Sequence, residues 1–172
     1  MCSSDLTGLV ACAMFLPGNR GWEIWGGVVW VISAFLDRAD GELARIGGKT
    51  SRWGHLYDFY TDVLITGLFF VAIGIGLRAT WLDGWAVPLG LLAGGSIAVC
   101  DVVSEALERR DPSGKRAYQG AWGFDLDDLL YLFGPFAWLG WLAPLLIGAG
   151  VGGAIFLAAT SWRLARMTAR QA

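Results

Sequence analysis

Long apolar segments are the sequence feature that most restricts how this chain can fold. Residues 58–77 and 85–107 form two such segments, and each reaches the roughly 20 residues that cross the hydrocarbon core of a bilayer. Lipid offers no hydrogen-bond partners to a peptide backbone, so segments of this kind have to be helical. A mean hydropathy of +0.52, with 55% apolar residues among 172, agrees with this inference. We therefore expect an all-α protein, a polytopic membrane helical bundle.

The apolar segments and their breaks predict six helices in one domain that covers residues 1–172. Glycine and proline divide the last apolar stretch, 129–159, into two helices at 140–143. The first helix is expected to be partial, because it supplies only about a dozen apolar residues. It is not predicted to be a signal peptide, since a basic n-region and a small-residue cleavage site are missing. The expected ranges are approximately 6–17, 22–45, 54–78, 84–108, 125–139 and 142–167.

Two acidic stripes interrupt the apolar pattern. In the second helix, Asp37, Asp40 and Gly41 lie at helical spacing, and the stripe continues through Ala44 and Arg45. In the third helix, Gly54, Asp58 and Asp62 repeat at every fourth position. The segment between the stripes, 46–53, is short and contains Gly47-Gly48. The two helices should therefore form an antiparallel hairpin in which the stripes face each other.

The four aspartates predict a metal site. Neighbouring carboxylates repel one another and burial adds to the cost of keeping them ionised, so a positive charge is expected between them. Hard oxygen ligands of this kind suit Mg²⁺ or Mn²⁺, and Mg²⁺ is often shared with substrate phosphates. Glycine within the stripes leaves room for a ligand to approach the backbone. A solvated acidic face is the alternative, which accounts for any single aspartate but poorly for all four at this spacing.

The segment reads DxxDGxxARx8GxxxDxxxD and resembles the signature of the CDP-alcohol phosphatidyltransferase family of integral membrane enzymes. Every fixed position of that signature is present, and the apolar segmentation also resembles the family's six-helix membrane domain. In that family the first helix is longer and begins with a polar segment that contributes to the nucleotide site. We therefore expect this chain to have lost the start of its first helix, with residues 1–5 not native in origin.

The resemblance implies transfer of a substituted phosphate from a CDP-linked alcohol to the hydroxyl of an acceptor alcohol in phospholipid biosynthesis, with release of CMP. It implies two Mg²⁺ or Mn²⁺ ions, membrane lipids as surroundings and a homodimer as a further partnership. By position, the metal ligands would be Asp37, Asp40, Asp58 and Asp62, with Asp62 also the catalytic base. The nucleotide-binding positions would be Asp40, Gly41, Ala44, Arg45 and Gly54.

Basic residues gather on the side of the motif. The positive-inside rule therefore places the motif and the C-terminus in the cytoplasm, in a protein of the cell's inner or plasma membrane. Four of these basic residues lie in the loop after the fourth helix and could bind an acceptor phosphate. They are Arg109, Arg110, Lys115 and Arg116. Attraction to anionic lipid headgroups explains the same residues equally well. On balance we predict a CDP-diacylglycerol donor and a phosphorylated polyol acceptor.

Several other interpretations stay open at this level. A CDP-aminoalcohol transferase with diacylglycerol as acceptor, and a truncated inactive homologue, share the motif. A transporter would spread its aspartates through the membrane depth, and a purely structural subunit would show damage to the motif. Asp101 and Glu105 share a helix face that could point toward the aspartates, and the acidic residues up to Asp128 are expected to favour a helix N-terminus. A basic stripe for nucleic acid is absent from the sequence, so no nucleic-acid partner is expected.

Overall fold

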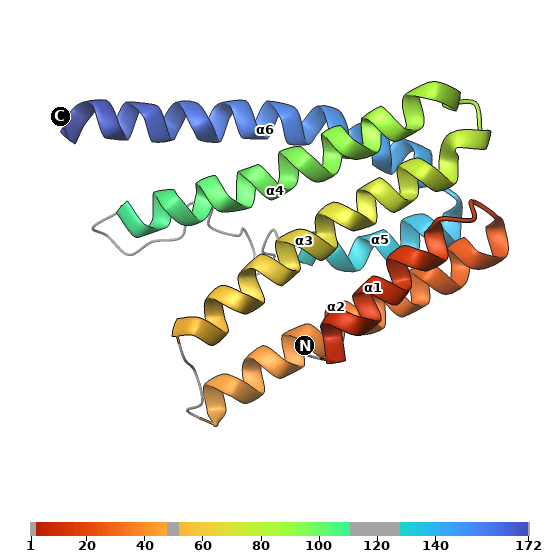
Figure 1. Cartoon of the computed structure of the whole chain (residues 1–172), viewed down its shortest axis with the longest axis horizontal. Helices are drawn as coiled ribbons and strands as arrows, with labels where there is room; N and C mark the ends of the chain where they lie inside the picture. The colour runs from red at the N-terminus through yellow and green to blue at the C-terminus, as the bar shows by residue number, and fades with distance from the viewer. Residues whose placement is uncertain (1–2, 48–51, 111–127, 172) are drawn as a thin grey trace.

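The computed structural model describes residues 3–47, 52–110 and 128–171. The described part contains six α-helices and no strand, as expected, and the helices run roughly alongside one another in an elongated bundle (Figure 1). Two short 3₁₀ turns, η1 (Leu77–Ala79) and η2 (Asp83–Trp85), connect the third helix to the fourth. The helices are α1 (Ser3–Phe15), α2 (Arg20–Ile46), α3 (Arg52–Gly76), α4 (Ala86–Arg110), α5 (Leu129–Leu139) and α6 (Leu142–Gln171).

The expected helix boundaries are close to the observed ones where local signals exist. Gly140 ends α5 with a left-handed φ of 76°, which confirms the predicted division of the last apolar stretch. Asn19 precedes α2, and its side-chain oxygen accepts a hydrogen bond from the backbone N–H of Trp22. The sixth helix continues beyond the predicted end, to Gln171. The start predicted for the fifth helix, at 125–127, lies outside the described residues.

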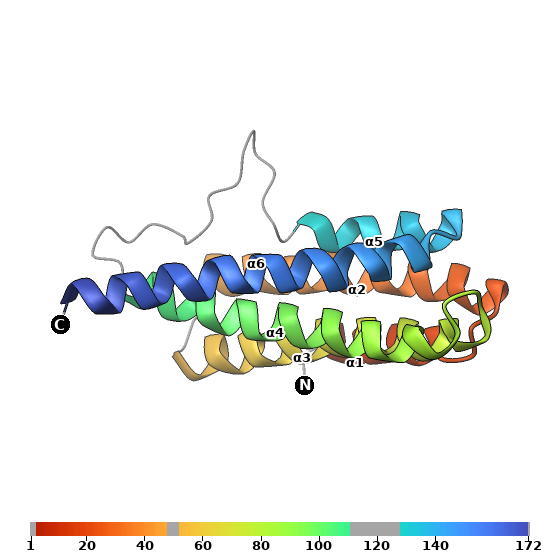
Figure 2. The ribbon, with the colours of Figure 1, turned by 90° about the horizontal axis from the view of Figure 1, so that it is seen from above.

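The helices form an arc in which each packs mainly against its neighbours, in the order α5, α2, α1, α3, α4 and α6. The view from above places α5, α6 and α2 on one side, with α1, α3 and α4 on the other (Figure 2). Helix α1 therefore lies between α2 and α3. Its first described turn lies beside Ser33, near the middle of α2, because the hydroxyl of Ser33 donates to the carbonyl of Ser4 over 2.8 Å. The ends of α2 and α3 that carry the aspartates extend past α1 (Figure 1).

Glycines allow α3 and α4 to approach each other closely. A Cβ at Gly94 would lie 2.5 Å from the carbonyl oxygen of Gly67, and one at Gly90 would lie 2.7 Å from that of Phe70. A Cβ at Gly74 would in turn lie 2.7 Å from the carbonyl oxygen of Ala86. Small residues at such positions let helix backbones approach closely, and the resulting van der Waals contacts contribute to association between membrane helices. Gly67, Gly74, Gly90 and Gly94 thus allow the close approach of α3 and α4.

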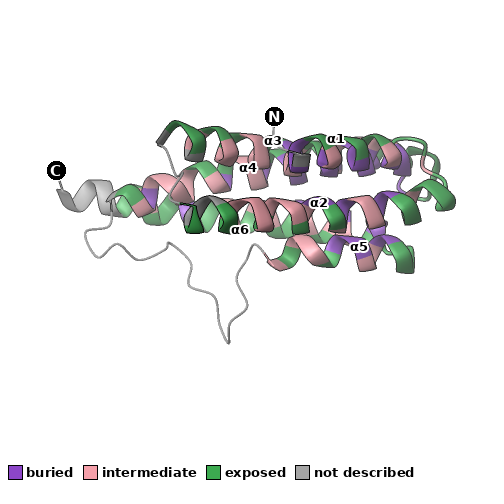
Figure 3. Ribbon diagram, turned by 90° about the horizontal axis from the view of Figure 1, so that it is seen from below, coloured by how far each residue is buried: buried purple, intermediate pink, exposed green. Residues whose placement is uncertain are grey.

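An aromatic cluster joins α2, α3 and α5. The rings of Trp30 and Phe69 have centroids 4.1 Å apart, and Phe69 stacks on Phe133 at 4.9 Å. Phe15 of α1 meets Phe69 edge to face. The buried side chains are concentrated around α1, α3 and α5, whereas much of α6 is half-buried or exposed (Figure 3). The packed core thus lies away from the aspartate end of the bundle.

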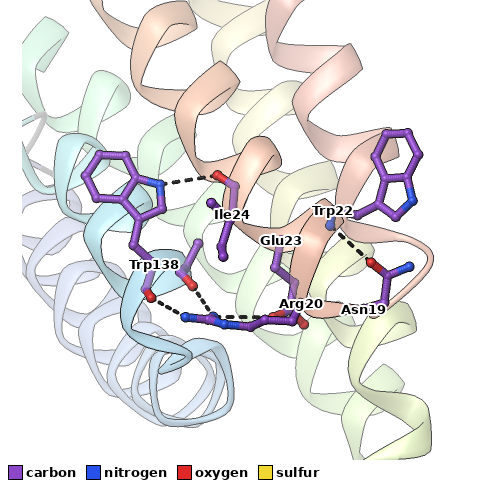
Figure 4. A network of polar contacts seen from close by, with 7 residues as sticks. Asn19, Arg20, Trp22, Glu23, Ile24 and Trp138 are labelled. Carbon is purple, nitrogen blue, oxygen red and sulfur yellow. Dashed lines mark hydrogen bonds and ion pairs between the residues drawn. The ribbon is translucent and has the colours of Figure 1, made fainter.

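Arg20, at the start of α2, caps the C-terminus of α5 (Figure 4). Its guanidinium donates to the carbonyl oxygens of Ala137, at 2.5 Å, and of Trp138. Glu23 lies 3.6 Å from the same guanidinium, and the indole N–H of Trp138 donates to the carbonyl of Ile24 over 3.2 Å. A cation at this position complements the negative end of the helix dipole. It adds to the backbone capping there, because the carbonyl of Ala137 also accepts a hydrogen bond from the N–H of Gly140. Helix α5 is therefore fastened to α2 at its C-terminal end.

Within the described residues, three helical segments are long and apolar enough to cross a membrane: Leu56–Ala79, Asp83–Arg109 and Leu142–Arg166. Helix α2 is not among them, because its 27 residues include the charged half of the motif. Helices α1 and α5 are apolar but shorter. The result is a helical membrane bundle in which long spans and short helices are mixed.

Candidate active site at the acidic end of the bundle

Three of the four predicted aspartates come together where α2 and α3 pass each other. The carboxylates of Asp37, Asp58 and Asp62 each offer an oxygen, and these oxygens all lie within 4.8 Å of one another. All three residues are half-buried. Asp58 and Asp62 lie one turn apart on α3, so they share a face, and Asp37 reaches them from α2. Three of the four carboxylates predicted to face each other therefore meet, although α1 lies between α2 and α3 along much of their length.

Asp40 is placed differently from the other three aspartates. It is half-buried on α2, one turn beyond Asp37, and does not belong to the group of three whose carboxylates meet. Its assignment as a metal and nucleotide ligand stays a prediction. The described group is therefore asymmetric, with one carboxylate from α2 and two from α3.

Open space surrounds Gly41, the motif glycine of α2. Among the described residues, no atom outside its own helix backbone and chain neighbours lies within 4 Å of where a Cβ would be. Gly54, the motif glycine of α3, is exposed in that helix's first turns. Ala44 and Arg45 lie in α2, but their side chains are outside the described part. The space at Gly41 agrees with the expectation that glycine leaves room for a ligand here.

Apolar packing is sparse at this end of the bundle. Leu43 and Ile46 of α2 are exposed, and so are Trp53, Tyr57 and Tyr60 of α3. These residues contrast with the fully buried Phe69 and Phe70 farther along α3. A substrate or a lipid headgroup could therefore reach the aspartates without displacing a packed core.

The basic residues assigned to an acceptor phosphate are only partly described. Arg109 is exposed, and its Nε donates to a carboxylate oxygen of Glu105 over 2.9 Å. The side chain of Arg110 and the whole of Lys115 and Arg116 lie outside the described residues. Glu105 thus pairs within its own helix, and neither it nor Asp101 joins the described carboxylate group.

Asp128 corrects one expectation. It occupies the position before α5 but makes no side-chain capping hydrogen bond. Its carboxylate instead accepts a hydrogen bond from Nη1 of Arg38 at 2.6 Å, which joins α5 to the residue after Asp37. A capping role was expected because acidic residues commonly stand at helix N-termini. The sequence signal for the Arg38–Asp128 pair was the presence of Arg38 inside the motif. The spacing of the motif residues did not identify a partner 90 residues away.

The first residues of α1 are integrated into the bundle. Ser4 and Asp5 are buried, at 3% and 2% exposure, and the carbonyl of Ser4 accepts hydrogen bonds from Ser33 and Thr7. The hydroxyl of Ser4 has no hydrogen-bond partner among the described groups. These polar residues lie on the same side of the core as the aspartate cluster, since Ser33 is one turn from Asp37.

The three carboxylates fit a hard divalent cation. They supply only oxygen ligands, they converge within a few ångströms, and they come from two helices whose backbones are held in place farther along by the core. Oxygen-only sites of this type favour Mg²⁺, Mn²⁺ or Ca²⁺ over softer metals. The fold and this site together define a polytopic helical membrane protein with an acidic, metal-compatible centre at one end.

Comparison with known proteins specifies the family. The sequence profile of the CDP-alcohol phosphatidyltransferase family matches residues 5–160. The chain belongs to this family, which confirms the resemblance inferred from the motif, and it is an integral membrane protein.

Two curated relatives are similar to part of the chain. A phosphatidylinositol phosphate synthase of Streptomyces avermitilis is 36% identical over 98 residues, which is 52% of this chain and 37% of that protein. An archaetidylinositol phosphate synthase of Pyrococcus horikoshii is 36% identical over 59 residues, which is 34% of this chain and 31% of that protein. The matched part spans only about a third of each relative's own length.

Proposed function

We propose that this protein transfers a substituted phosphate from a CDP-linked alcohol to the hydroxyl of an acceptor alcohol and releases CMP. The observation that carries the proposal is the convergence of Asp37, Asp58 and Asp62 in a chain of this family. In the reaction, a new bond forms between the acceptor oxygen and the phosphorus that carries the substituent. The bond from that phosphorus to the oxygen bridging the two phosphates breaks, and CMP leaves with that oxygen.

The protein's own residues have distinct tasks in this reaction. Asp62 accepts the proton of the acceptor hydroxyl, since a carboxylate within hydrogen-bond reach serves as a general base. Asp37, Asp40 and Asp58 would hold the divalent cations, of which we propose two, and Asp62 would contact metal as well. When bound, Mg²⁺ or Mn²⁺ neutralises the charge on the diphosphate and on the leaving CMP. The open space at Gly41 admits the nucleotide beside α2, with Ala44, Arg45 and Gly54 as further nucleotide contacts.

The donor is proposed to be CDP-diacylglycerol and the acceptor a phosphorylated polyol. Both relatives carry the name of an inositol phosphate product, which fits an acceptor that already bears a phosphate. Arginine binds phosphate through two parallel hydrogen bonds and lysine binds it as a point charge. Arg109 and Arg110 at the end of α4, with Lys115 and Arg116 after it, are the residues we assign to that phosphate. The site is proposed to open to the cytoplasm.

The test is CMP release and lipid product formation by the purified protein in nanodiscs. Radiolabelled CDP-diacylglycerol is offered with Mg²⁺ and a panel of acceptors: inositol phosphate, glycerol phosphate, free inositol and serine. We expect a labelled product with a phosphate-bearing acceptor, and no turnover in excess EDTA. Product with diacylglycerol and a CDP-aminoalcohol would favour the alternative transferase. Turnover that persists in EDTA would refute the role of the aspartates, and no product from any pair would favour an inactive homologue.

A further inference from the structure

One face of α2 packs against α5. Arg20 donates to the last carbonyls of α5. Gly27 packs closely against Gly134, because a Cβ at Gly27 would lie 3.2 Å from the carbonyl oxygen of Gly134. The hydroxyl of Tyr131 donates to the carbonyl of Ala34 over 3.1 Å. Residues spaced three, four or seven apart form one stripe of a helix. The residues of α2 that contact α5 have this spacing: Arg20, Gly27, Val31, Ala34 and Arg38.

Asp37 lies on a different face from its neighbour Arg38. Consecutive residues of an α-helix are rotated by about 100°. Arg38 therefore reaches Asp128 of α5 while Asp37 reaches Asp58 and Asp62 of α3. Any rotation of this end of α2 about its own axis moves both side chains together. The contact on one face thus influences the carboxylate on the other.

Three polar contacts hold α5 against successive turns of α2. The indole N–H of Trp30 donates to the carbonyl of Leu130 over 3.0 Å, Tyr131 reaches Ala34, and Arg38 reaches Asp128. Arg38 lies farthest toward the acidic end. Beyond it, the large apolar side chains of α2, Leu43 and Ile46, are 66% and 82% exposed. The Arg38–Asp128 pair therefore acts where apolar packing contributes little to the orientation of α2.

We infer that Arg38 is a positioning residue for the aspartate cluster: its pairing with Asp128 sets the rotation of the α2 end and so the placement of the Asp37 carboxylate relative to Asp58 and Asp62. The consequence for catalysis rests on the proposed function, but the consequence for metal binding does not. Arg38 does not touch the substrate in this scheme, since its charge is directed toward α5. Metal sites depend on such supporting contacts because ligand oxygens have to be held in a defined geometry.

This role has a signature that a purely structural role lacks. The Arg38 side chain is 58% exposed, while that of Asp128 is 18% exposed. A single ion pair whose cation lies in solvent contributes little to global stability. Loss of the pair should therefore leave the unfolding temperature nearly unchanged and weaken metal binding. Arg20 provides the matched control, because it fastens the other end of α5 to α2 far from the aspartates. Its loss should have the opposite pattern.

The experiment measures Mn²⁺ binding by electron paramagnetic resonance on the full chain in nanodiscs, without substrate, together with thermal unfolding. Arg38→Ala and Asp128→Ala are each expected to weaken Mn²⁺ binding about tenfold and to shift the unfolding midpoint by no more than about 2 °C. The double variant should bind Mn²⁺ no more weakly than either single variant, because each single variant already removes the interaction between Arg38 and Asp128. Exchange of the charges, Arg38→Asp with Asp128→Arg, should restore most of the affinity. Arg20→Ala should lower the unfolding midpoint and leave Mn²⁺ binding unchanged.

Unchanged Mn²⁺ affinity in Arg38→Ala would overturn the inference, and so would a wild-type protein that binds no Mn²⁺. A loss in Arg38→Ala that Asp128→Ala does not reproduce would also overturn it, since Arg38 would then act without its partner. A wild-type protein that binds Mn²⁺ but releases no CMP with any donor and acceptor would refute the proposed function alone. In that case the Mn²⁺ measurements still decide the role of Arg38.

Discussion

Asp58 and Asp62 lie one turn apart on α3, yet we predict that they differ in function. Asp58→Asn should weaken Mn²⁺ and donor binding, because it removes a charged ligand. Asp62→Asn should lower kcat by about 10² to 10⁴, as expected for loss of a general base, while the affinity for the donor is largely retained. The measurement is kcat and KM for CMP release, with donor affinity determined separately by titration.

The control for this pair is Asp101→Asn, a described carboxylate outside the group of three. It should leave both parameters near the wild-type values. If Asp58→Asn and Asp62→Asn lose donor affinity equally, the assignment of Asp62 as base is wrong, and both residues serve as ligands.

Gly41 allows a prediction in which stability and activity change in opposite directions. Gly41→Leu adds a side chain to open space and replaces glycine in a helix, which typically stabilises by about 1 kcal/mol. The same side chain would occupy the space proposed for the nucleotide, so KM for the donor should rise at least about tenfold, equivalent to about 1.4 kcal/mol. Gly152→Leu is the control, because Gly152 is also surrounded by open space but lies in α6.

Gly152→Leu should gain stability without any change in KM. A donor KM that Gly41→Leu leaves unaltered would mean that the space beside Gly41 is not used by the nucleotide.

At the residue scale, spacing predicted that carboxylates of the second and third helices would face each other, and three of the four do so. Asp58 and Asp62 share a face in any α3 helix. The short connection keeps the adjoining ends of α2 and α3 near each other, so that Asp37 meets them, although α1 separates the two helices farther along. The same reasoning could not separate Asp40 from the other three, because a helix face is wide enough to include both α2 aspartates. It also could not find Asp128 as the partner of Arg38, since that contact depends on where α5 packs.

Among the helices, α3 and α4 offer a test of close packing with two adjacent glycines. A Cβ at Gly94 would lie 2.5 Å from the carbonyl oxygen of Gly67, whereas one at Gly95 would meet nothing within 4 Å. Both substitutions to alanine gain helix propensity, but overpacking against a backbone costs about 1 to 3 kcal/mol. Gly94→Ala should therefore be less stable than Gly95→Ala by about that amount. The measurement is unfolding of the two variants side by side in the same bilayer mimic.

Equal stability of the two alanine variants would show that α3 and α4 separate at little cost, contrary to the geometry. At this scale, hydropathy predicted the helical segments, and the glycine and proline positions predicted the break at Gly140. It predicted helix ends less well, as with the extension of α6 to Gln171, because a helix can continue past the apolar segment once it leaves the membrane. The clamp of Arg20 on α5 was not predicted, because it joins residues more than a hundred positions apart.

The whole molecule is predicted to have its acidic end in the cytoplasm. Gly47 is exposed at the end of α2, and Gly84 is exposed in η2 at the opposite end of the bundle (Figure 1). In a Cys2→Ser background, a membrane-impermeant maleimide should label Gly84→Cys in intact spheroplasts and Gly47→Cys only in inverted vesicles. Cys12 and Cys100 are buried and should react with neither preparation. Labelling of Gly47→Cys from outside the cell would reverse the orientation inferred from the positive-inside rule.

The sequence by itself determined the class of fold, the membrane setting and the family. Apolar segment length dictates helices in lipid, and the motif spacing dictates which carboxylates share a face. Only the tertiary structure decided that Asp37, Asp58 and Asp62 form the group, that Gly41 faces open space, and that α5 is fastened to α2 by Arg20 and Arg38. The physical reason is the sequence distance over which each kind of information acts. Periodicity describes one helix at a time, whereas the order of helices around the bundle depends on packing between segments that are distant along the chain.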